Sequence, residues 1–282
     1  MKYAKKSSIK SYLDNLIYSC LLLCVISIQN CPAQTKVGLD NWFNCETDQN
    51  TGLPFHYLWT DTTLNGYSVW GKIFQSRGAV LSTIKRPFPS ELSNLDIYII
   101  VDPDTTSENP SPNYIMKEDA SSIGQWVNDG GVLIILANDA PNCEFTHLNN
   151  FSKMFGIVFN HVTLHHVIDK NWEMGAFTSL PDHPLFKGVK KIYMKDISSL
   201  SLANNAISIL RENGNVFIAE TNYGKGMVVA VGDPWIYNEY IDHAKLPNDF
   251  DNLKAAENLT DYLLLHTRKK ITQDGPKLLI IK

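Results

Sequence analysis

The chain has 282 residues, of which 44% are hydrophobic and 19% are charged, so it carries enough apolar side chains for a globular core. Its formal net charge is −4 at pH 7, and the basic residues gathered in the first 33 positions leave the remainder more acidic still. This balance excludes a general attraction for nucleic acid or for anionic membranes.

The first 33 residues have the order of an export signal. Basic "MKYAKKSSIK" precedes apolar "LIYSCLLLCVISI", and "CPAQ" places a small residue before a cleavage point after Ala33. This order is typical of a signal peptide and predicts a periplasmic or secreted protein. The apolar run is shorter than the roughly 20 residues of a membrane span, and no later stretch qualifies. An uncleaved anchor and lipid attachment at Cys31 remain alternatives.

Strand and helix patterns alternate along the rest of the chain. Runs of β-branched and aromatic residues indicate strands buried on both faces, and apolar side chains at near-helical spacing that end at glycines indicate helices. These patterns predict strands at 78–85, 95–104 and 132–139 and helices at 116–131 and 146–156.

The second half of the chain is less regular over 161–215. Residues 215–233 then read as a β-hairpin, and 250–270 read as an amphipathic helix. The alternation predicts an α/β fold with a mostly parallel sheet covered by helices on both faces. We expect one domain over 34–270, followed by a tail at 271–282 that adds an edge strand or hangs loose.

Ligands of such sheets bind beyond the carboxyl ends of the strands. The first polar segment at such an end is 102–106, where Asp102 and Asp104 flank a proline. These carboxylates could bind a cation or serve as acid and base. The alternative is a turn in which they cap backbone N–H groups.

The second polar segment, 137–144, continues into the next predicted helix and supplies Asn138, Asp139, Glu144 and His147 as candidates. Cys143 lies four residues before His147, the spacing of a thiol beside a base on one helical face. A thiol hydrolase normally carries its nucleophile on a glycine-rich elbow, and the elbow position here reads Ala137-Asn138-Asp139. A helix cap at Asp139 or Asn142 is the alternative.

The third segment, "GDPWIYNEY" at 232–240, combines aromatic faces with carboxylate and amide groups. Sugars suit this mixture, because their C–H faces stack on rings and their hydroxyls pair with polar side chains. The candidates are Asp233, Trp235, Tyr237, Asn238 and Glu239. The alternative is that the rings pack over the sheet end and Asp233 caps the backbone directly after it.

The sequence gives little support for a metal site or a cofactor site. His161, His165 and His166 form a dense group in which His161 and His165 are four residues apart, but zinc would need a third ligand, which Asp169 or Glu173 could supply. Cys45 and Cys143, the two cysteines outside the leader, could form a disulfide in an oxidising compartment, but two cysteines do not establish a pair. We therefore predict no cofactor and no metal.

Several segments together resemble a known family. They are "GLPFHYLWTD", "DIYIIVDPDT", "WVNDGGVLIILANDAPNCEFTHLN", "FGIVFN", "EMGAF", "HPLF" and "YGKGMVVAVGDPWIYNEYIDHAKLPNDFDNLKAAENL". They resemble the C-terminal accessory domain of bacterial unsaturated rhamnogalacturonyl and glucuronyl hydrolases. The resemblance covers most of residues 38–265. It implies a flavodoxin-like, class I glutamine amidotransferase-like fold and a setting in polysaccharide breakdown. Amidotransferases need a cysteine at the elbow, so this sequence does not fit that activity.

These observations predict an exported, non-amidotransferase module associated with degradation of acidic polysaccharides of the pectin or glucuronide type. It would bind an oligosaccharide or a partner hydrolase through the three loops. The alternative is a hydrolase in its own right, with Asp233 or Glu239 and Asp102 or Asp139 as acid and base. A third hypothesis is a purely structural partner of a hydrolase. No nucleic acid and no membrane span after signal cleavage are expected.

Overall fold

The computed structural model describes residues 34–48, 50–63, 65–241 and 243–274, and within these ranges the side chains of Glu239 and residues 268–274 are not described. From Thr35 onward the described residues belong to one compact unit. The predicted signal segment, with its cleavage point and Cys31, lies outside the described residues, as do positions 275–282 of the predicted tail.

A nine-stranded sheet forms the centre of the molecule. Its parallel part has the spatial order β2 (Val80–Ile84), β1 (Lys36–Asp40), β3 (Ile97–Val101), β4 (Val132–Leu136) and β11 (Gly226–Val231). This is the flavodoxin-like order of parallel strands. Four antiparallel strands extend the sheet beyond β11, namely β10 (Asn215–Tyr223), β9 (Ile207–Glu212), β8 (Leu200–Leu202) and β5 (Ile157–Phe159). The predicted α/β fold is confirmed.

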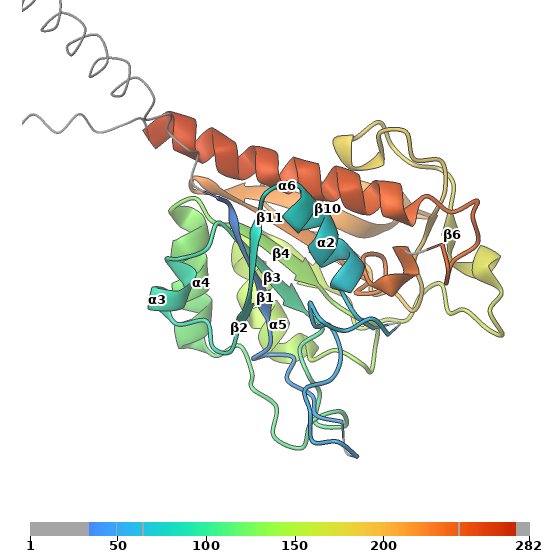
Figure 1. Cartoon of the computed structure of the whole chain (residues 1–282), viewed down its shortest axis with the longest axis horizontal. Helices are drawn as coiled ribbons and strands as arrows, with labels where there is room; N and C mark the ends of the chain where they lie inside the picture. Colours follow the sequence, from blue (N-terminus) through green and yellow to red (C-terminus); the bar gives the residue numbers. More distant parts are fainter. Residues whose placement is uncertain (1–33, 49, 64, 242, 275–282) are drawn as a thin grey trace, which may run out of the picture. The chain divides into compact units, whose positions relative to one another are not determined.

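Helices cover both faces of this sheet (Figure 1). One face carries α2 (Ser68–Ser76) and α6 (Asn252–Asp274), and the other carries α3 (Pro89–Leu92), α4 (Lys117–Asn128) and α5 (Phe145–Ser152). Because successive strand residues point to opposite faces, β3 serves both layers. Ile97 and Ile99 join the core under α2 and α6, whereas Tyr98 and Ile100 join the core under the other helices.

Strand β1 is a central element that the sequence pattern did not predict. It pairs in parallel with β2 and β3 and so lies inside the sheet, although its sequence is only KVGLD. Gly38 permits this position, because a Cβ there would lie 2.6 Å from the Leu95 Cδ1 atom and 2.8 Å from the Ile84 Cγ1 atom. Helix α6 also differs from the prediction, since it continues to Asp274, past the expected domain boundary at residue 270.

The described residues also form a small separate sheet and four short 3-10 helices, and the sheet and two of these helices fall in the irregular stretch 161–215. The sheet pairs β6 (Ala176–Phe177) with β7 (Ile192–Tyr193), and the helices are η1 (Lys153–Phe155), η2 (Trp172–Gly175), η3 (Pro184–Phe186) and η4 (Glu239–Ile241). Within the described ranges, no helix combines the length and the apolar character that crossing a bilayer requires.

Candidate functional site

The carboxyl ends of the parallel strands bring together polar side chains from distant parts of the chain. Asp40 ends β1, Asp102 follows β3, Asn138 follows β4, and Asp233 follows β11. The strand order changes direction between β1 and β3, which is where ligands bind in sheets of this order. All four side chains are buried, with at most 5% of each exposed, so protein groups fill this edge of the sheet.

Asp102 lies at a strained strand end. Its φ of 42° is in the left-handed region that L side chains rarely adopt. Its Oδ2 atom accepts hydrogen bonds from the Tyr57 hydroxyl (2.9 Å) and the Asn138 amide (2.8 Å), whereas its Oδ1 atom has no hydrogen-bond partner among the described residues. Burial, followed by the negative charge of Glu108, raises the pKa of Asp102 well above its usual range. The strained turn is therefore at Asp102, and residues 137–139 show no positive φ.

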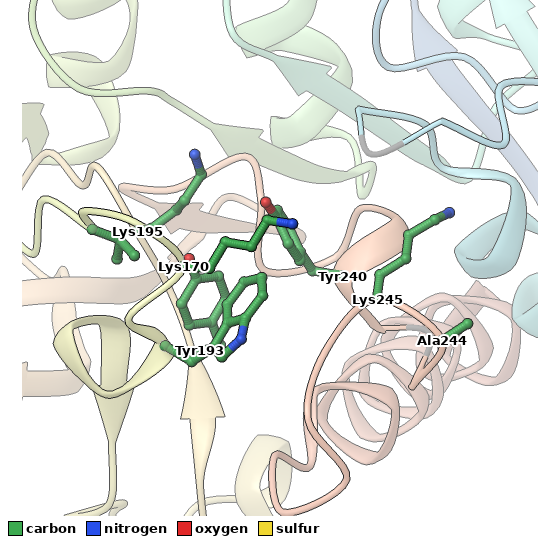
Figure 2. A pocket seen from close by; sticks show the side chains of 8 residues that line it. Lys170, Tyr193, Lys195, Tyr240, Ala244 and Lys245 are labelled. Carbon is green, nitrogen blue, oxygen red and sulfur yellow. The ribbon is translucent and has the colours of Figure 1, made fainter.

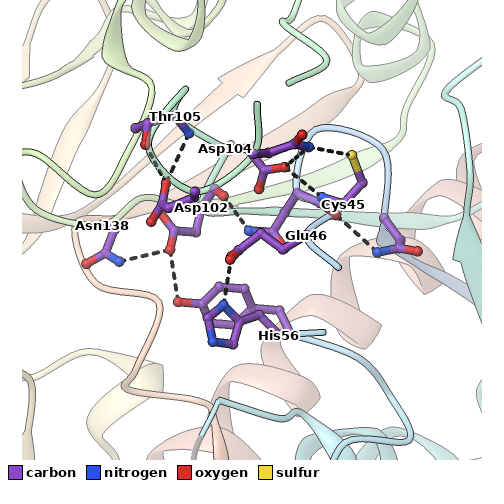
Figure 3. A network of polar contacts seen from close by, with 12 residues as sticks. Cys45, Glu46, His56, Asp102, Asp104, Thr105 and Asn138 are labelled. Carbon is purple, nitrogen blue, oxygen red and sulfur yellow. Dashed lines mark hydrogen bonds and ion pairs between the residues drawn. The ribbon is translucent and has the colours of Figure 1, made fainter. Parts of the chain in front are cut away.

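Three further carboxyls lie near Asp102, and we call Glu46, Asp102, Asp104 and Glu108 the carboxyl cluster (Figure 3). Asp104 accepts from the Cys45 backbone N–H (3.0 Å) and the Asn109 side-chain amide (2.8 Å), so it binds a backbone N–H of a distant segment. Burial is the largest cause that raises the pKa of Asp104 and of Glu108. Glu46 pairs with His56 at 2.7 Å.

The candidates after β4 lie in hydrogen-bonded turns. Asp139 accepts from the Thr163 hydroxyl (2.6 Å) and the Asn142 amide (2.8 Å). Glu144 caps α5 by accepting from two backbone N–H groups, at 2.9 and 3.0 Å, and the His147 ring stacks on Tyr114 with centroids 4.4 Å apart. Glu144 also lies 3.2 Å from the His147 Nδ1 atom, whereas the hydrogen bonds of Asp139 go to Thr163 and Asn142.

The two mature cysteines are free thiols, so they do not form a disulfide. Cys143 is buried, and burial together with the charge of Asp102 raises the pKa of its thiol well above the usual range. The thiolate is the nucleophilic form of cysteine, and this environment disfavours it. The Cys143–His147 pair therefore lacks the electrostatics of an activated nucleophile.

The 233–240 segment divides into a buried part and a pocket-facing part. Asp233 is fully buried and caps the turn by accepting from the backbone N–H groups of Trp235 (2.6 Å) and Lys195 (3.2 Å). Tyr237 and Asn238 are also fully buried, and the Tyr237 ring packs against Trp70 with centroids 5.2 Å apart. Asp233 therefore caps the backbone and the Tyr237 ring packs in the interior, as the alternative interpretation of this segment expects. The side chain of Glu239 lies outside the described part of the chain.

An open pocket of about 460 Å³ lies beside this segment (Figure 2). We call it the lysine pocket, because three lysines and three aromatic residues line it: Lys170, Lys195, Lys245, Trp172, Tyr193 and Tyr240. Figure 2 shows the three ammonium groups borne by three separate segments of the chain. Sequence reasoning did not select these lysines, Trp172 or Tyr193. For all of them except Lys245, the available signal was the recurrence of lysine and aromatic residues in the irregular stretch 161–215.

Local packing fixes the aromatic wall of the lysine pocket. The side-chain amide of Asn252, at the start of α6, accepts from the Tyr193 backbone N–H (2.7 Å) and donates to its carbonyl (2.9 Å). Gly175 allows η2 to approach β7, because a Cβ there would lie 2.4 Å from the Met194 carbonyl oxygen. The Trp172 and Tyr193 rings then meet edge to face, with centroids 5.2 Å apart.

The electrostatics of the lysine pocket favour a ligand that is negatively charged. Lys195 lies over the Trp235 ring at 4.3 Å and contacts Asp196 at 3.3 Å. Burial raises the pKa of Tyr193 and of Tyr240, so both hydroxyls remain protonated hydrogen-bond donors at neutral pH. The Tyr193 hydroxyl is buried and has no hydrogen-bond partner among the described residues.

Backbone strain also gathers around the lysine pocket. Nine non-glycine residues of the described chain have positive φ, and four of them lie in its walls or next to them: His165, Asp169, Lys170 and Asp196. Such conformations cost about 1–3 kcal/mol each and cluster at functional sites. Three others of the nine lie at the carboxyl cluster: Asp102 itself, Tyr57, which donates to Asp102, and His56, which pairs with Glu46.

The three histidines considered for zinc make separate contacts. His165 lies 3.2 Å from Glu212, His166 lies 2.6 Å from Asp196, and the His161 ring meets Phe145 edge to face. Among the residues that the structure describes, no group of three or more His, Cys, Asp or Glu side chains could hold a metal ion.

The comparisons with known proteins support the fold. The family DUF4350, described as a domain of unknown function, matches residues 60–260. No curated protein matches the sequence. The mmIFT52 N-terminal domain superposes with a TM-score of 0.61 and 12% identity, over 82% of this chain and 97% of that one. Cytoplasmic Protein STM1381 from Salmonella typhimurium LT2 gives a TM-score of 0.54 and 11% identity, over 82% and 99%. These identities show a shared fold alone.

Proposed function

The chain belongs to the DUF4350 family, and from this premise we propose that it is an exported module that binds acidic saccharides during polysaccharide breakdown and has no amidotransferase activity. The observation that carries the proposal is the lysine pocket, which three lysines and three aromatic residues line, with the Lys245 ammonium donating to the Thr62 carbonyl at 2.9 Å. Rings stack on the C–H faces of sugars, and ammonium groups pair with their carboxylates. Export follows from the predicted signal peptide, and the buried Cys143 thiol supports the absence of amidotransfer.

Replacing Lys195 by Met should weaken the binding of a uronic acid trisaccharide about tenfold or more, because a hydrogen bond to a charged group contributes about 1.5–3 kcal/mol. Trp172→Ala should weaken it through loss of the stacking surface. Isothermal titration with trigalacturonate measures both effects, and wild-type affinity should fall as salt is added.

The matched control is Lys225→Met, since Lys225 is an exposed lysine directly before β11, at the amino end of the strand whose carboxyl end leads to the pocket. Its affinity should equal that of the wild type. Equal binding of the carboxyl-reduced, neutral trisaccharide, or no binding of any uronic acid oligosaccharide, would contradict the proposal. A partner hydrolase that binds here in place of a free glycan would be detected by co-purification, and free trigalacturonate would then compete with it.

A hydrolase remains the second candidate, because Asp102 combines a strained backbone with a raised pKa. A carboxyl whose pKa is raised by burial suits a general acid, and such groups contribute about 10²–10⁴-fold to rates. On this candidate, Asp102→Asn lowers the release of reducing sugar from a polyuronide by that factor. Unchanged release in the variant excludes Asp102 as the acid.

A further inference from the structure

A second open pocket, of about 580 Å³, lies beyond the carboxyl ends of β3 and β4. Four separate segments of the chain form its wall, which includes three threonines and three residues with rings: Thr105, Thr106, Thr146, Tyr114, Phe145 and His161. We call it the threonine pocket. It lies at the edge of the sheet where ligands of this fold bind, and the lysine pocket does not include it.

Contacts between the segments hold the wall of the threonine pocket in place. The Glu144 backbone N–H donates to the Pro103 carbonyl at 2.9 Å, which joins the segment after β4 to the segment after β3. The Tyr114 ring lies nearly parallel to the His147 ring of α5, with 9° between the two planes. A ligand therefore meets a wall that is already ordered, which lowers the entropic cost of binding.

The electrostatics of the threonine pocket differ from those of the lysine pocket. Among the described residues that line it, none is a lysine or an arginine, and the carboxylate of Glu144 accepts from two backbone N–H groups at the start of α5. Burial raises the pKa of the Cys143 thiol in its wall, and the charges of Asp102 and Glu108 raise it further. This negative surrounding disfavours an anion. An uncharged ligand with hydroxyl groups and C–H faces suits the threonines and the rings.

One short segment, 161–167, connects the two pockets. His161 lines the threonine pocket and Val167 lines the lysine pocket, and six residue steps span at most about 22 Å. The backbone groups of Leu164 and Ile197 exchange two hydrogen bonds, of 2.9 and 2.8 Å, which fix the middle of this segment. Strands β3, β4 and β11 are neighbours in the sheet, so both pockets lie at the same edge. A single extended oligosaccharide can therefore reach both.

We propose that the threonine pocket is a second saccharide subsite, which binds a neutral sugar residue of the same chain whose uronate residue binds in the lysine pocket. This inference rests on the proposed function and narrows its ligand to a polysaccharide that contains both neutral and acidic sugars. Because the two residues are linked, binding of the second becomes intramolecular, and the affinity of the longer ligand exceeds that of either part.

Isothermal titration of the full mature chain tests the ligand class. The probes are trigalacturonate and two hexasaccharides, one alternating galacturonate with rhamnose and one, from hyaluronan, alternating glucuronate with N-acetylglucosamine. At least one of the two alternating hexasaccharides should bind about tenfold or more tightly than trigalacturonate. Hexagalacturonate is the control for length, and it should not show this gain because each of its residues is charged.

Two variants test the position of the subsite with the tighter hexasaccharide. Tyr114→Ala should weaken its binding about threefold to tenfold through loss of the ring surface. Thr146→Phe should remove the gain over trigalacturonate, since Thr146 is exposed and a larger side chain there occupies the pocket. Both variants should keep trigalacturonate affinity within about twofold of wild type, because the two pockets are separate. Phe88→Ala is the matched control, an exposed aromatic residue outside the described walls of both pockets, and it should change neither affinity.

The results separate this inference from the proposed function. If trigalacturonate binds and neither alternating hexasaccharide binds more tightly, the second subsite is overturned and the proposed function stands. Unchanged hexasaccharide affinity in both variants overturns the assignment to the threonine pocket. Equal weakening of both ligands by the variants does so too, since the effect then lies in the lysine pocket. Absence of binding by every acidic saccharide removes the inference together with the proposed function.

Discussion

Asp40→Asn should make the stability of the protein less dependent on pH. The free energy of unfolding of the wild type should fall by roughly 3 kcal/mol as the pH rises from about 4 to about 6, because of Asp40, and the variant should lack this decrease. Asp40 is buried at the end of β1, and burial raises its pKa from an ordinary 3.8 to about 6. The Tyr98 hydroxyl (2.5 Å) and the backbone N–H groups of residues 42–44 oppose this shift without cancelling it.

The sign depends on which state holds the proton more tightly. The folded-state pKa is raised, so the folded protein binds the Asp40 proton more tightly than the unfolded chain does. The resulting stabilisation is fully present below pH 4 and is lost as the pH rises through about 6. Asparagine has no such proton. It can also retain both sets of contacts, because its oxygen can accept from the backbone and its amide can donate to the Tyr98 oxygen.

Urea unfolding of both proteins between pH 4 and pH 8 measures this effect. The free energy of unfolding of the variant minus that of the wild type should rise by roughly 3 kcal/mol across the interval. Asp102 and Asp233 also have raised pKa values, and their contribution cancels in this difference. Exposed Thr106→Ala, which removes no titratable group, should give a flat difference. Parallel curves for wild type and Asp40→Asn would show that this carboxyl is not protonated in the folded state.

Trp70→Ala should lower the free energy of unfolding by about 3–5 kcal/mol, the cost of removing a large buried aromatic side chain. Trp70 is fully buried in α2, and its indole N–H donates to the Thr260 hydroxyl of α6 at 3.0 Å. Its ring packs against Tyr67 and Tyr237, at centroid distances of 5.5 and 5.2 Å. Tyr67 in turn donates to the Pro234 carbonyl at 2.7 Å, so Trp70 supports the 233–240 segment from beneath.

Chemical denaturation at one pH measures the loss. Leu265→Ala is the control, because Leu265 is 49% exposed on α6 and should change stability by less than about 0.5 kcal/mol. The Trp70→Ala variant should also bind trigalacturonate more weakly than the wild type, since Tyr240 lies at the end of the supported segment. A cost near 1 kcal/mol would mean that the neighbouring rings collapse into the space.

The parts of the fold that could be predicted from sequence are those in which one segment carries its own pattern. Strands β3 and β4 are unbroken apolar runs, and α4 and α5 have helical spacing with glycines after their ends. The β10–β11 hairpin was visible from its turn. Strand β1 could not be predicted in this way. Its Gly38 is needed because the Leu95 and Ile84 side chains, which are distant in sequence, pack where a Cβ atom would lie.

The same reason explains how much of the site could be predicted. Asp102 and Asn138 were selected because each follows a recognisable strand, and the structure brings them together at 2.8 Å. Lys170, Lys195 and Lys245 belong to loops without periodicity, so their proximity depends on tertiary contacts such as the pairing of β6 with β7 and the contact of Asn252 with Tyr193. Burial also cannot be read from composition, so Tyr237 and Asn238 were predicted as ligand contacts although they lie in the interior.

The parallel pairing of β4 with β11 has a consequence for how the chain reaches this structure. Val132 pairs with Met227, and β5 to β10 lie between them in sequence. During synthesis, one edge of the apolar strand β4 stays unpaired until β11 has left the ribosome. Contacts of such high order slow folding, and an unpaired edge invites aggregation. We expect refolding to be slow and concentration-sensitive, with the stretch from β1 to β4 gaining hydrogen-exchange protection before the hairpin docks.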